Sequence, residues 1–267
     1  MPPIDGAAGP MILSTPMYLP QPPVPRVWPQ GRDVHLWSID LSAAATLPRD
    51  CLDEGERERA QRFVYAEDAS RYVRAHLGLR AILASYLGSD PSRLRFAAQA
   101  QGKPRLLGEG AGLEFNLSHS KDMALVALGT AGELGVDIEA VREDLPGSEL
   151  AAAVLCAEEL EQLAAYPEGR QATPFVACWA RKEACLKALG LGLNLPPRSL
   201  HVGLQSRRQQ LQVGDQLLEL MPLPAPAGYC AALAAVGGLG TVHSFALEPF
   251  VPTAPVPLPP STQRPSV

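Results

Sequence analysis

Two carboxylates, Asp137 and Glu139, lie two positions apart in the apolar stretch GVDIEAV at residues 135–141. Successive side chains of a β-strand point to opposite faces, so we expect both acids on one face and their apolar neighbours on the other. Like charges at this spacing repel each other, and acidic residues are uncommon in strands. A divalent cation held between the acids would account for the pattern. The alternative is an edge strand whose acidic face is solvated.

A third acid, Glu183, lies in the stretch PFVACWARKEACLKAL, which is predicted to form a helix. Trp179 precedes it by four residues and Lys187 follows it by four, so the three side chains share one helix face. A salt-bridged surface helix has the same spacing, but the large aromatic side chain favours a face that lines a cleft. With the two strand acids, Glu183 would form a set of three carboxylates that suits Mg2+, an ion that also keeps water and phosphate oxygens as ligands.

Residues that could contact a ligand with several phosphates occur in four segments. These are an arginine-rich stretch with six arginines against three acids over residues 57–80, the turn QGKP, the end of the stretch FNLSHS, and the helix after Glu183. Each residue taken alone has an ordinary surface or turn role, and only the combination predicts anion binding. The candidates are Arg59, Lys103, Ser118, His119 and Lys187.

The chain has 267 residues and an apolar fraction of 46%, enough for one large domain or two packed ones. Its 27 prolines are uneven, with nine in residues 1–30 and seven in residues 249–267. We therefore predict a disordered, proline-rich tail at each of these ends. The folded body is predicted to divide into an N-terminal α+β lobe at residues 31–141 and a C-terminal α+β lobe at residues 142–248.

Composition and charge argue against several classes of protein. No stretch reaches the roughly 18 apolar residues that a membrane span needs, and the N-terminal residues do not have the order of a secretory signal. Five cysteines, odd in number and without C-x-x-C spacing, predict reduced thiols and a cytoplasmic protein rather than disulfides or a structural zinc site. A net charge of −5, from 23 basic and 28 acidic residues, argues against nucleic acid as a partner.

The predicted elements come in the same order twice, helices followed by mostly antiparallel strands. The N-terminal half has a strand at residues 33–41, an amphipathic helix at residues 54–68, and a second helix with Asp68 as its N-cap and Gly88 at its end. The strands that follow are predicted at residues 94–96, 113–120, 124–129 and 135–141.

The C-terminal half begins with one broken or two short helices at residues 147–167. Thr173 as N-cap and Pro174 at the first helical position predict the start of the helix that carries Glu183, and Gly190 predicts its end. This duplicated order predicts an α+β fold of two lobes. The closing strands are predicted at residues 200–204, 211–214, 216–220, 229–236 and 242–248.

Four motifs occur together in one order, namely GKP, FNLSHS, LGVDIE and WARKEACLKALG. With them, the chain resembles the Sfp-type 4'-phosphopantetheinyl transferases over about residues 33–247. The resemblance implies a monomeric pseudodimer of two α+β lobes that binds coenzyme A in the cleft. It also implies the reaction, which transfers the phosphopantetheine arm of coenzyme A to a serine of an acyl or peptidyl carrier protein and releases adenosine 3',5'-bisphosphate. The carrier would belong to a fatty-acid, polyketide or nonribosomal-peptide synthase.

The resemblance assigns roles to single residues. Asp137, Glu139 and Glu183 match the Mg2+ ligands of the family. Glu183 also matches the residue that takes the proton of the attacking serine, directly or through water, and Lys187 matches a contact to the transferred phosphate. The matched coenzyme A contacts are Arg59 at the 3'-phosphate, and Lys103, Ser118 and His119.

Two positions depart from some members of the family. Glu56 stands where a second basic contact to the 3'-phosphate can occur, and Tyr72 stands where a smaller hydroxyl residue can occur. Both concern how tightly the 3'-phosphate is held, and Arg57 or Arg71 could substitute. Two other functions are compatible with parts of the pattern, a coenzyme A- or carrier-binding module without turnover and a divalent-metal nuclease built on VDIE.

Overall fold

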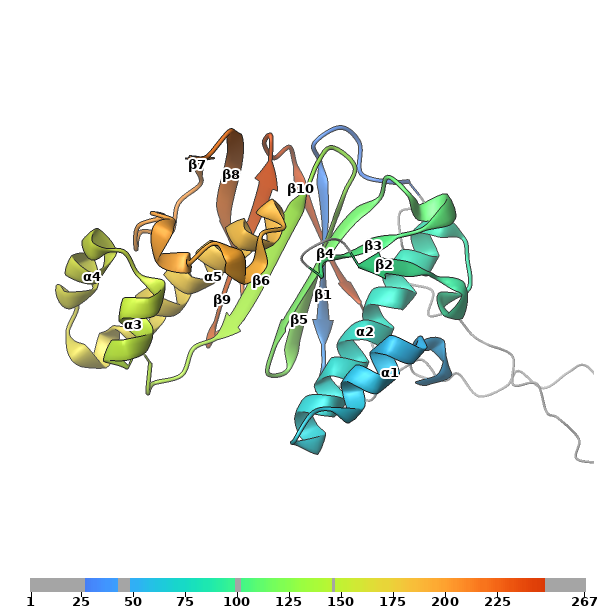
Figure 1. Cartoon of the computed structure of the whole chain (residues 1–267), viewed down its shortest axis with the longest axis horizontal. Coiled ribbons are helices and arrows are strands. Elements are labelled where there is room, and N and C mark those ends of the chain that lie inside the picture. The colour runs from blue at the N-terminus through green and yellow to red at the C-terminus, as the bar shows by residue number, and fades with distance from the viewer. Residues whose placement is uncertain (1–26, 43–48, 99–101, 146, 248–267) are drawn as a thin grey trace, which may run out of the picture.

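The computed structural model describes most of the predicted folded body. Its described residues form two lobes of mixed helix and sheet that stand side by side (Figure 1), which confirms the predicted α+β class. Most of each predicted tail lies outside them. None of the helices in this part of the chain has the length and apolar character of a membrane span. The described residues are 27–42, 49–98, 102–145 and 147–247.

The first lobe contains a four-stranded sheet in the order β10-β1-β5-β4, with helix α2 (Ala66–Leu87) packed across it. Strand β1 pairs antiparallel with β5 and parallel with β10, and the β4–β5 pair is antiparallel. Trp37 and Phe115 from the sheet pack with Ile82 and Leu83 of α2 in the core. The strands span Val34–Asp40 (β1), Glu114–Ser120 (β4), Met123–Gly129 (β5) and Val242–Leu247 (β10).

Two smaller parts complete the first lobe. Helix α1 (Glu54–Gln61) begins at a capping box, in which Asp53 and Glu56 each accept a hydrogen bond from the other's backbone N–H, and it lies against α2. A two-stranded antiparallel ribbon is formed by β2 (Phe96–Ala98) and β3 (Pro104–Leu106).

The second lobe contains an antiparallel sheet in the order β6-β9-β8-β7, with helix α5 (Ala172–Leu189) packed on β6 and β9. Phe175 and Leu186 of α5 lie in one buried cluster with Leu218 and Leu220 of β8. The predicted pair of short helices is confirmed. The remaining elements span Leu134–Ala140 (β6), Gln209–Val213 (β7), Gln216–Leu223 (β8), Tyr229–Val236 (β9), Ser148–Val154 (α3) and Ala157–Ala164 (α4).

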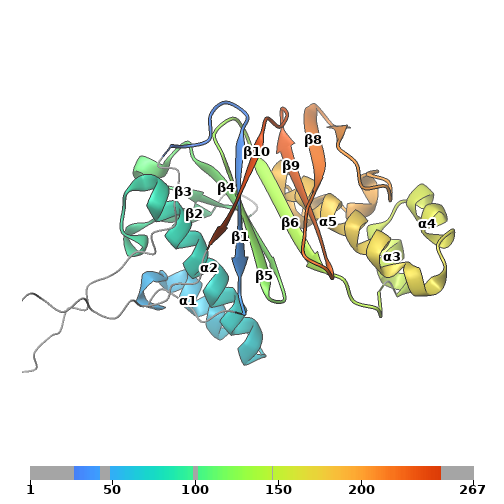
Figure 2. The ribbon, with the colours of Figure 1, turned by 180° about the vertical axis from the view of Figure 1, so that it is seen from behind.

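The two sheets divide the chain differently from the lobe boundaries that the sequence predicted. Strand β6 was placed at the end of the N-terminal lobe, but it is the edge strand of the second sheet. Strand β10 was placed in the C-terminal lobe, but the chain returns with it to the first sheet, where it lies beside β1 (Figure 2). Apolar residues of β1 and β5 share a buried cluster with those of β6 and β9, so the lobes pack on a common core. The sheet to which β6 and β10 belong depends on pairing with strands far away in the sequence, which local sequence patterns do not show.

The helix starts differ from their predicted caps by a few residues. The predicted helix at residues 54–68 ends at Gln61, and α2 begins at Ala66 with Tyr65 at its N-cap, so Asp68 lies in the first turn. An acid is favourable there because it faces the positive end of the helix dipole. Helix α5 begins at Ala172, so Pro174 is its third residue, where the missing N–H has no intrahelical partner to lose.

The strand predicted at residues 200–204 is wrong, because this segment binds side chains instead of a neighbouring strand. The carboxylate of Glu159 accepts hydrogen bonds from the N–H groups of Val202 and Gly203. The guanidinium of Arg181 donates to three carbonyls of residues 202–205, including that of Val202 at 3.1 Å. Lys182 is fully buried and forms an ion pair with Glu159. These charges therefore satisfy the backbone of an irregular segment.

Helix α5 and strand β6 approach so closely that only glycine fits between them. A Cβ atom built on Gly135 would lie 2.0 Å from the carbonyl oxygen of Ala184 and 2.4 Å from the nitrogen of Ala188. Both atoms belong to backbone, so neither can move without the helix. Because Lys187 lies between these two contact points in sequence and Glu183 precedes them, this contact sets the depth of both residues against the sheet.

We predict that Gly135→Ala destabilises the fold by at least about 1–3 kcal/mol, because the methyl group overpacks this contact. Any activity that depends on Glu183 and Lys187 should fall as well, since α5 must shift. Chemical denaturation measures the first effect. Gly169→Ala is the matched control, because a Cβ there meets nothing within 4 Å. Equal stability of the Gly135 variant and wild type would contradict the prediction.

Candidate active site

The acids of β6 face a cavity of about 850 Å³ between the two lobes. Asp137 and Glu139 both line it, whereas Val136 and Ile138 are fully buried in the common core on the other face. The strand alternation predicted from the sequence is confirmed. The other walls come from α1, α2, the β2–β3 ribbon, β4 and α5.

Helix α5 brings Glu183 and Lys187 to the same cavity. The ammonium of Lys187 lies 2.6 Å from Asp137 Oδ1 and donates to the hydroxyl of Ser118 at 3.0 Å. Ser118 in turn donates to Asp137 Oδ1 at 2.8 Å. The single hydroxyl proton of Ser118 is therefore donated to Asp137. The structure therefore brings together the four predicted residues Asp137, Glu139, Glu183 and Lys187.

Burial and mutual repulsion disfavour the ionised forms of Glu139 and Glu183. Burial raises the pKa of Glu139 to about 7, repulsion from Asp137 and Glu183 adds to the rise, and Ser120 and Lys187 oppose it. Burial and then repulsion from Asp137 also raise the pKa of Glu183, against the attraction of Lys187. A group of carboxylates whose ionised forms are disfavoured in this way gains from a nearby cation.

The donor set fits a divalent metal. Asp137 Oδ2 is the one buried side-chain oxygen or nitrogen without a hydrogen-bond partner among the described residues, so an acceptor is available beside the other two acids. Three carboxylates are suitable ligands for a hard cation. Their oxygens are not all within 4.8 Å of one another. In the described part of the chain, three candidate metal-ligand atoms lie that close together only at Cys156, Glu159 and His201. Both carboxylate oxygens of Glu159 already accept hydrogen bonds there.

Basic and aromatic residues line the other end of the cavity. The guanidinium of Arg59 lies 6.0 Å from the ring centroid of Tyr72, which stacks on His76. His119 lines the cavity from β4. Burial lowers the pKa of His119, and the positive charges of Lys187 and Arg59 lower it further. Tyr72 therefore occupies an aromatic stack under the one predicted arginine that reaches this cavity.

Lys103 is not brought to the cavity, although its neighbours Gly102 and Pro104 line it. Its side chain is buried, and its ammonium forms an ion pair with Glu133 and donates to the carbonyl of Leu134 at 2.8 Å. This lysine joins the ribbon to the start of β6. A contact between Lys103 and a phosphate in the cavity would require this side chain to move.

Glu56, which stands where a basic residue was considered, has a structural role. Its carboxylate accepts a hydrogen bond at 2.7 Å from Arg80, whose side chain is fully buried, and Asp53 supplies a second carboxylate at 2.9 Å. Glu56 therefore neutralises a charge inside the first lobe. Neither suggested substitute reaches the 850 Å³ cavity, because Arg57 donates to a carbonyl and Arg71 pairs with acids around a second pocket.

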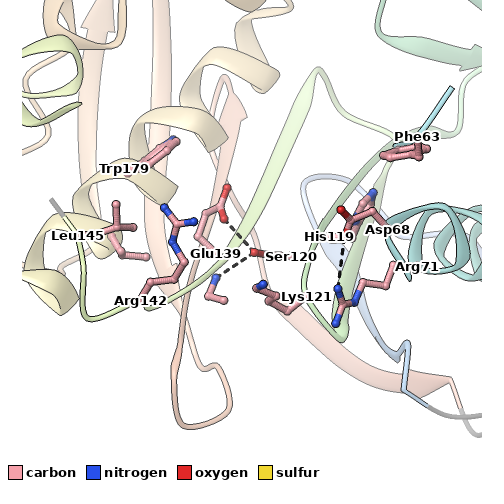
Figure 3. Close-up of a pocket in the computed structure, with 12 residues that line it drawn as sticks. Phe63, Asp68, Arg71, His119, Ser120, Lys121, Glu139, Arg142, Leu145 and Trp179 are labelled. Carbon is pink, nitrogen blue, oxygen red and sulfur yellow. Dashed lines mark hydrogen bonds and ion pairs between the residues drawn. The ribbon is translucent and has the colours of Figure 1, made fainter. Parts of the chain in front are cut away.

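This second pocket has a volume of about 350 Å³ and lies beside the larger cavity, at the ends of β4 and β6 (Figure 3). Glu139 and His119 line both pockets. Figure 3 shows Trp179, Leu145 and Arg142 on the side of the second lobe and Phe63 and Arg71 on the side of the first. The two pockets are thus adjacent and share Glu139, His119 and Phe63.

Comparison with known proteins identifies the family. A family model described as the 4'-phosphopantetheinyl transferase superfamily matches residues 133–230, and one described as 4'-phosphopantetheinyl transferase, N-terminal, matches residues 40–131. The chain is 33% identical over 237 residues to the 4'-phosphopantetheinyl transferase HetI of Nostoc sp., a match that covers 85% of this chain and 97% of the relative. The chain belongs to the 4'-phosphopantetheinyl transferase superfamily.

Two more distant matches cover shorter segments of this transferase. A 4'-phosphopantetheinyl transferase of Bacillus subtilis is 32% identical over 151 residues, which are 56% of this chain and 65% of the relative. The human L-aminoadipate-semialdehyde dehydrogenase-phosphopantetheinyl transferase is 29% identical over 169 residues, 55% of this chain and 54% of the relative. Family membership confirms the resemblance seen in the motifs. It makes the protein an enzyme that transfers phosphopantetheine to a carrier protein, with coenzyme A as donor and a divalent metal.

Two polar residues of the site were missed by the sequence analysis of the transferase. Asn116 lines the cavity and accepts a hydrogen bond from the N–H of Val136, and Ser120 donates to Glu139. A signal was present, because polar residues occupy every second position of FNLSHS from Asn116 on. That alternation predicts one polar strand face, but it does not say which strand that face meets.

We predict that Glu139→Gln raises the melting temperature of the metal-free transferase by roughly 2–4 °C per kcal/mol of repulsion removed. The pKa of Glu139 lies above its ordinary value in the folded state, so its ionised form destabilises the fold above about pH 7, and this cost fades as the pH falls. The variant should also gain less stability than wild type from an added divalent metal, because one carboxylate of the donor set is lost. Thermal unfolding with and without Mg2+ measures both effects. Glu143→Gln, at an exposed position nearby, is the control. No stabilisation of wild type by Mg2+ would contradict this assignment.

Proposed function

We propose that this transferase acts as a holo-[acyl-carrier-protein] synthase, which moves the 4'-phosphopantetheine arm of coenzyme A to a serine of an acyl or peptidyl carrier protein. Mg2+ would be held by Asp137, Glu139 and Glu183. The observation that carries the proposal is the convergence of these acids with Lys187 on one cavity, where Asp137 Oδ2 is buried and has no protein partner. All of these residues come from one chain, which supports a monomer as the active form.

The donor substrate is proposed to lie along the cavity from α1 to α5. Arg59 would contact the 3'-phosphate, with His119 and Lys187 at the pyrophosphate. These charges match several phosphates of one ligand. Ser118 is engaged with Asp137 and Lys187, so its role in binding coenzyme A would be indirect unless its hydrogen bonds change.

The reaction exchanges one P–O bond for another. The hydroxyl oxygen of the carrier serine attacks the phosphorus that bears the pantetheine, and the bond to the bridging oxygen of the pyrophosphate breaks, which releases adenosine 3',5'-bisphosphate. Glu183 would take the serine proton, directly or through water. Lys187 would contact the transferred phosphate. Bound Mg2+ would supply positive charge to the leaving bisphosphate.

The smaller pocket is proposed to admit the serine of the carrier. It is lined by Glu139, which it shares with the larger cavity, and by Lys121 and Arg142. Lys121 occupies the tip of the β4–β5 turn with a positive φ of 48°, a backbone conformation that two-residue hairpin turns require. Apolar contacts would come from Leu145 and Trp179. This rim suits an acidic segment with an apolar side.

The remaining parts of the proposal concern the setting of the enzyme. All five cysteines are free thiols, which supports a reducing compartment such as the cytoplasm. No nucleic-acid partner is proposed, since the acidic net charge does not favour one.

The decisive experiment is intact-protein mass spectrometry of an apo carrier protein with this enzyme, coenzyme A and Mg2+. We expect a mass gain of one phosphopantetheine arm that EDTA abolishes. Glu183→Gln should lower the transfer rate by at least about 100-fold, because it removes a metal charge and the proton acceptor while it keeps the side-chain shape. Coenzyme A binding should be reduced but detectable. Glu161→Gln, an exposed acid on α4, is the control. A near wild-type rate for the Glu183 variant would refute the mechanism.

For the acceptor side, we predict that reversal of charge at Lys121 or Arg142 lowers kcat/KM for an acidic carrier roughly ten-fold each, mainly through slower association. The KM for coenzyme A should stay unchanged. Steady-state kinetics at two salt concentrations measure the effect, which should shrink as salt rises. Arg93→Glu is the control, since this exposed arginine lies outside both pockets. An equal loss in the control would point to the net charge instead of this rim.

A further inference from the structure

Strand β6 has one edge that no strand of the described residues covers with a backbone ladder. Its other edge pairs with β9, and the free edge faces β4 of the first sheet. Three N–H groups on the free edge, at alternate positions, donate to side chains of β4. The pairs are Val136 to Asn116 Oδ1 at 2.8 Å, Ile138 to Ser118 Oγ at 3.3 Å and Ala140 to Ser120 Oγ at 3.1 Å. Polar side chains therefore join the two sheets where backbone carbonyls would otherwise do so.

The bond from Ala140 determines what the Ser120 hydroxyl can do. A hydroxyl has one proton to donate and lone pairs that accept. Because a lone pair of Ser120 Oγ accepts from Ala140 N–H, the hydroxyl proton is free to be donated to Glu139 Oε2, which lies 3.0 Å from Oγ (Figure 3). In the described part of the chain, this is the one hydrogen bond that the Glu139 carboxylate accepts. The acid on one sheet is thus held by a hydroxyl on the other.

Ser118, two residues before Ser120 on β4, makes the same two kinds of hydrogen bond, but Lys187 also helps to hold its acid. It accepts from Ile138 N–H and donates to Asp137 Oδ1, and it also accepts from the ammonium of Lys187. Lys187 holds the same oxygen of Asp137 directly. Asp137 therefore has two partners that fix its orientation, whereas Glu139 depends on a single one.

We propose that Ser120 is a positioning residue that orients Glu139 for metal binding across the junction of the two sheets. Glu139 is repelled by Asp137 and Glu183, and its long side chain has several rotamers by which it could turn away. The hydrogen bond from Ser120 keeps the carboxylate on the side of the other acids. The inference deepens the proposed function, since it rests on Glu139 as a metal ligand.

The test measures metal binding without carrier protein or coenzyme A. We expect Ser120→Ala to bind Mg2+ and Mn2+ about 10- to 100-fold more weakly than wild type in calorimetric titrations, the loss typical of removing a hydrogen bond that orients a ligand. In kinetics, the concentration of Mg2+ that gives half-maximal rate should rise by a similar factor, while kcat at saturating Mg2+ changes less. Mn2+ electron paramagnetic resonance should show an altered coordination signature.

Two further variants separate positioning from stability. Ser120→Thr keeps the hydroxyl on a strand that tolerates β-branching, and it should restore metal affinity to within a few-fold of wild type. Ser38→Ala is the matched control, because Ser38 lies on β1 of the same sheet and its hydroxyl donates to a backbone carbonyl away from the acids. It should leave metal affinity unchanged. Denaturation of each variant reports whether the loss of the bond to Ala140 unfolds the junction.

The possible outcomes distinguish this inference from the proposed function. If wild type binds metal and transfers the arm, and Ser120→Ala binds metal equally well, the positioning role is overturned and the proposed function stands. If Ser120→Ala loses metal affinity but wild type transfers no arm to any carrier, the positioning role stands and the proposed reaction fails. Failure of Ser120→Thr to restore affinity would assign the effect of Ser120→Ala to packing and overturn the inference. Absence of metal binding by wild type would overturn both.

Discussion

The contact of helix α5 with strand β6 at Gly135 is the constraint on which the site depends. A side chain of any size at this position would meet the helix backbone, so the sequence must keep a glycine for the two elements to touch. The close approach places Glu183 and Lys187 against the face that carries Asp137 and Glu139. Four charged groups are then concentrated at one end of an apolar junction, where Lys187 attracts acids whose ionised forms are disfavoured by burial and by repulsion from one another.

The junction between the lobes combines two kinds of contact with different tasks. Apolar residues on the inner faces of both sheets form one buried cluster, which supplies non-directional stabilisation. Beside it, the side chains of Asn116, Ser118 and Ser120 accept the N–H groups of β6. Hydrogen bonds are directional, so this second contact fixes the register of the strands. A junction that sets register also sets where Asp137 and Glu139 stand relative to the larger cavity.

The charged residues fall into two groups that serve different purposes. Arg80 is fully buried and is neutralised by Asp53 and Glu56, and the pair Lys182–Glu159 is buried in the second lobe. Each of these groups has its partners within the fold, so a charge there has no capacity left for a ligand. Asp137, Glu139 and Glu183 differ because they repel one another, and because an oxygen of Asp137 has no hydrogen-bond partner among the described residues.

The sequence by itself determined the local features of this protein. The alternation around Asp137, the helical spacing of Glu183 and Lys187 and the order of the motifs predicted the acids, their faces and the family, because strand and helix periodicity depend on neighbours in the chain. Tertiary structure decided which partner each charge meets. In the folded chain, Lys103 forms an ion pair with Glu133, Glu56 forms one with Arg80, and β10 pairs with β1 in the first sheet. These pairings join residues far apart in the chain, so no local pattern records them.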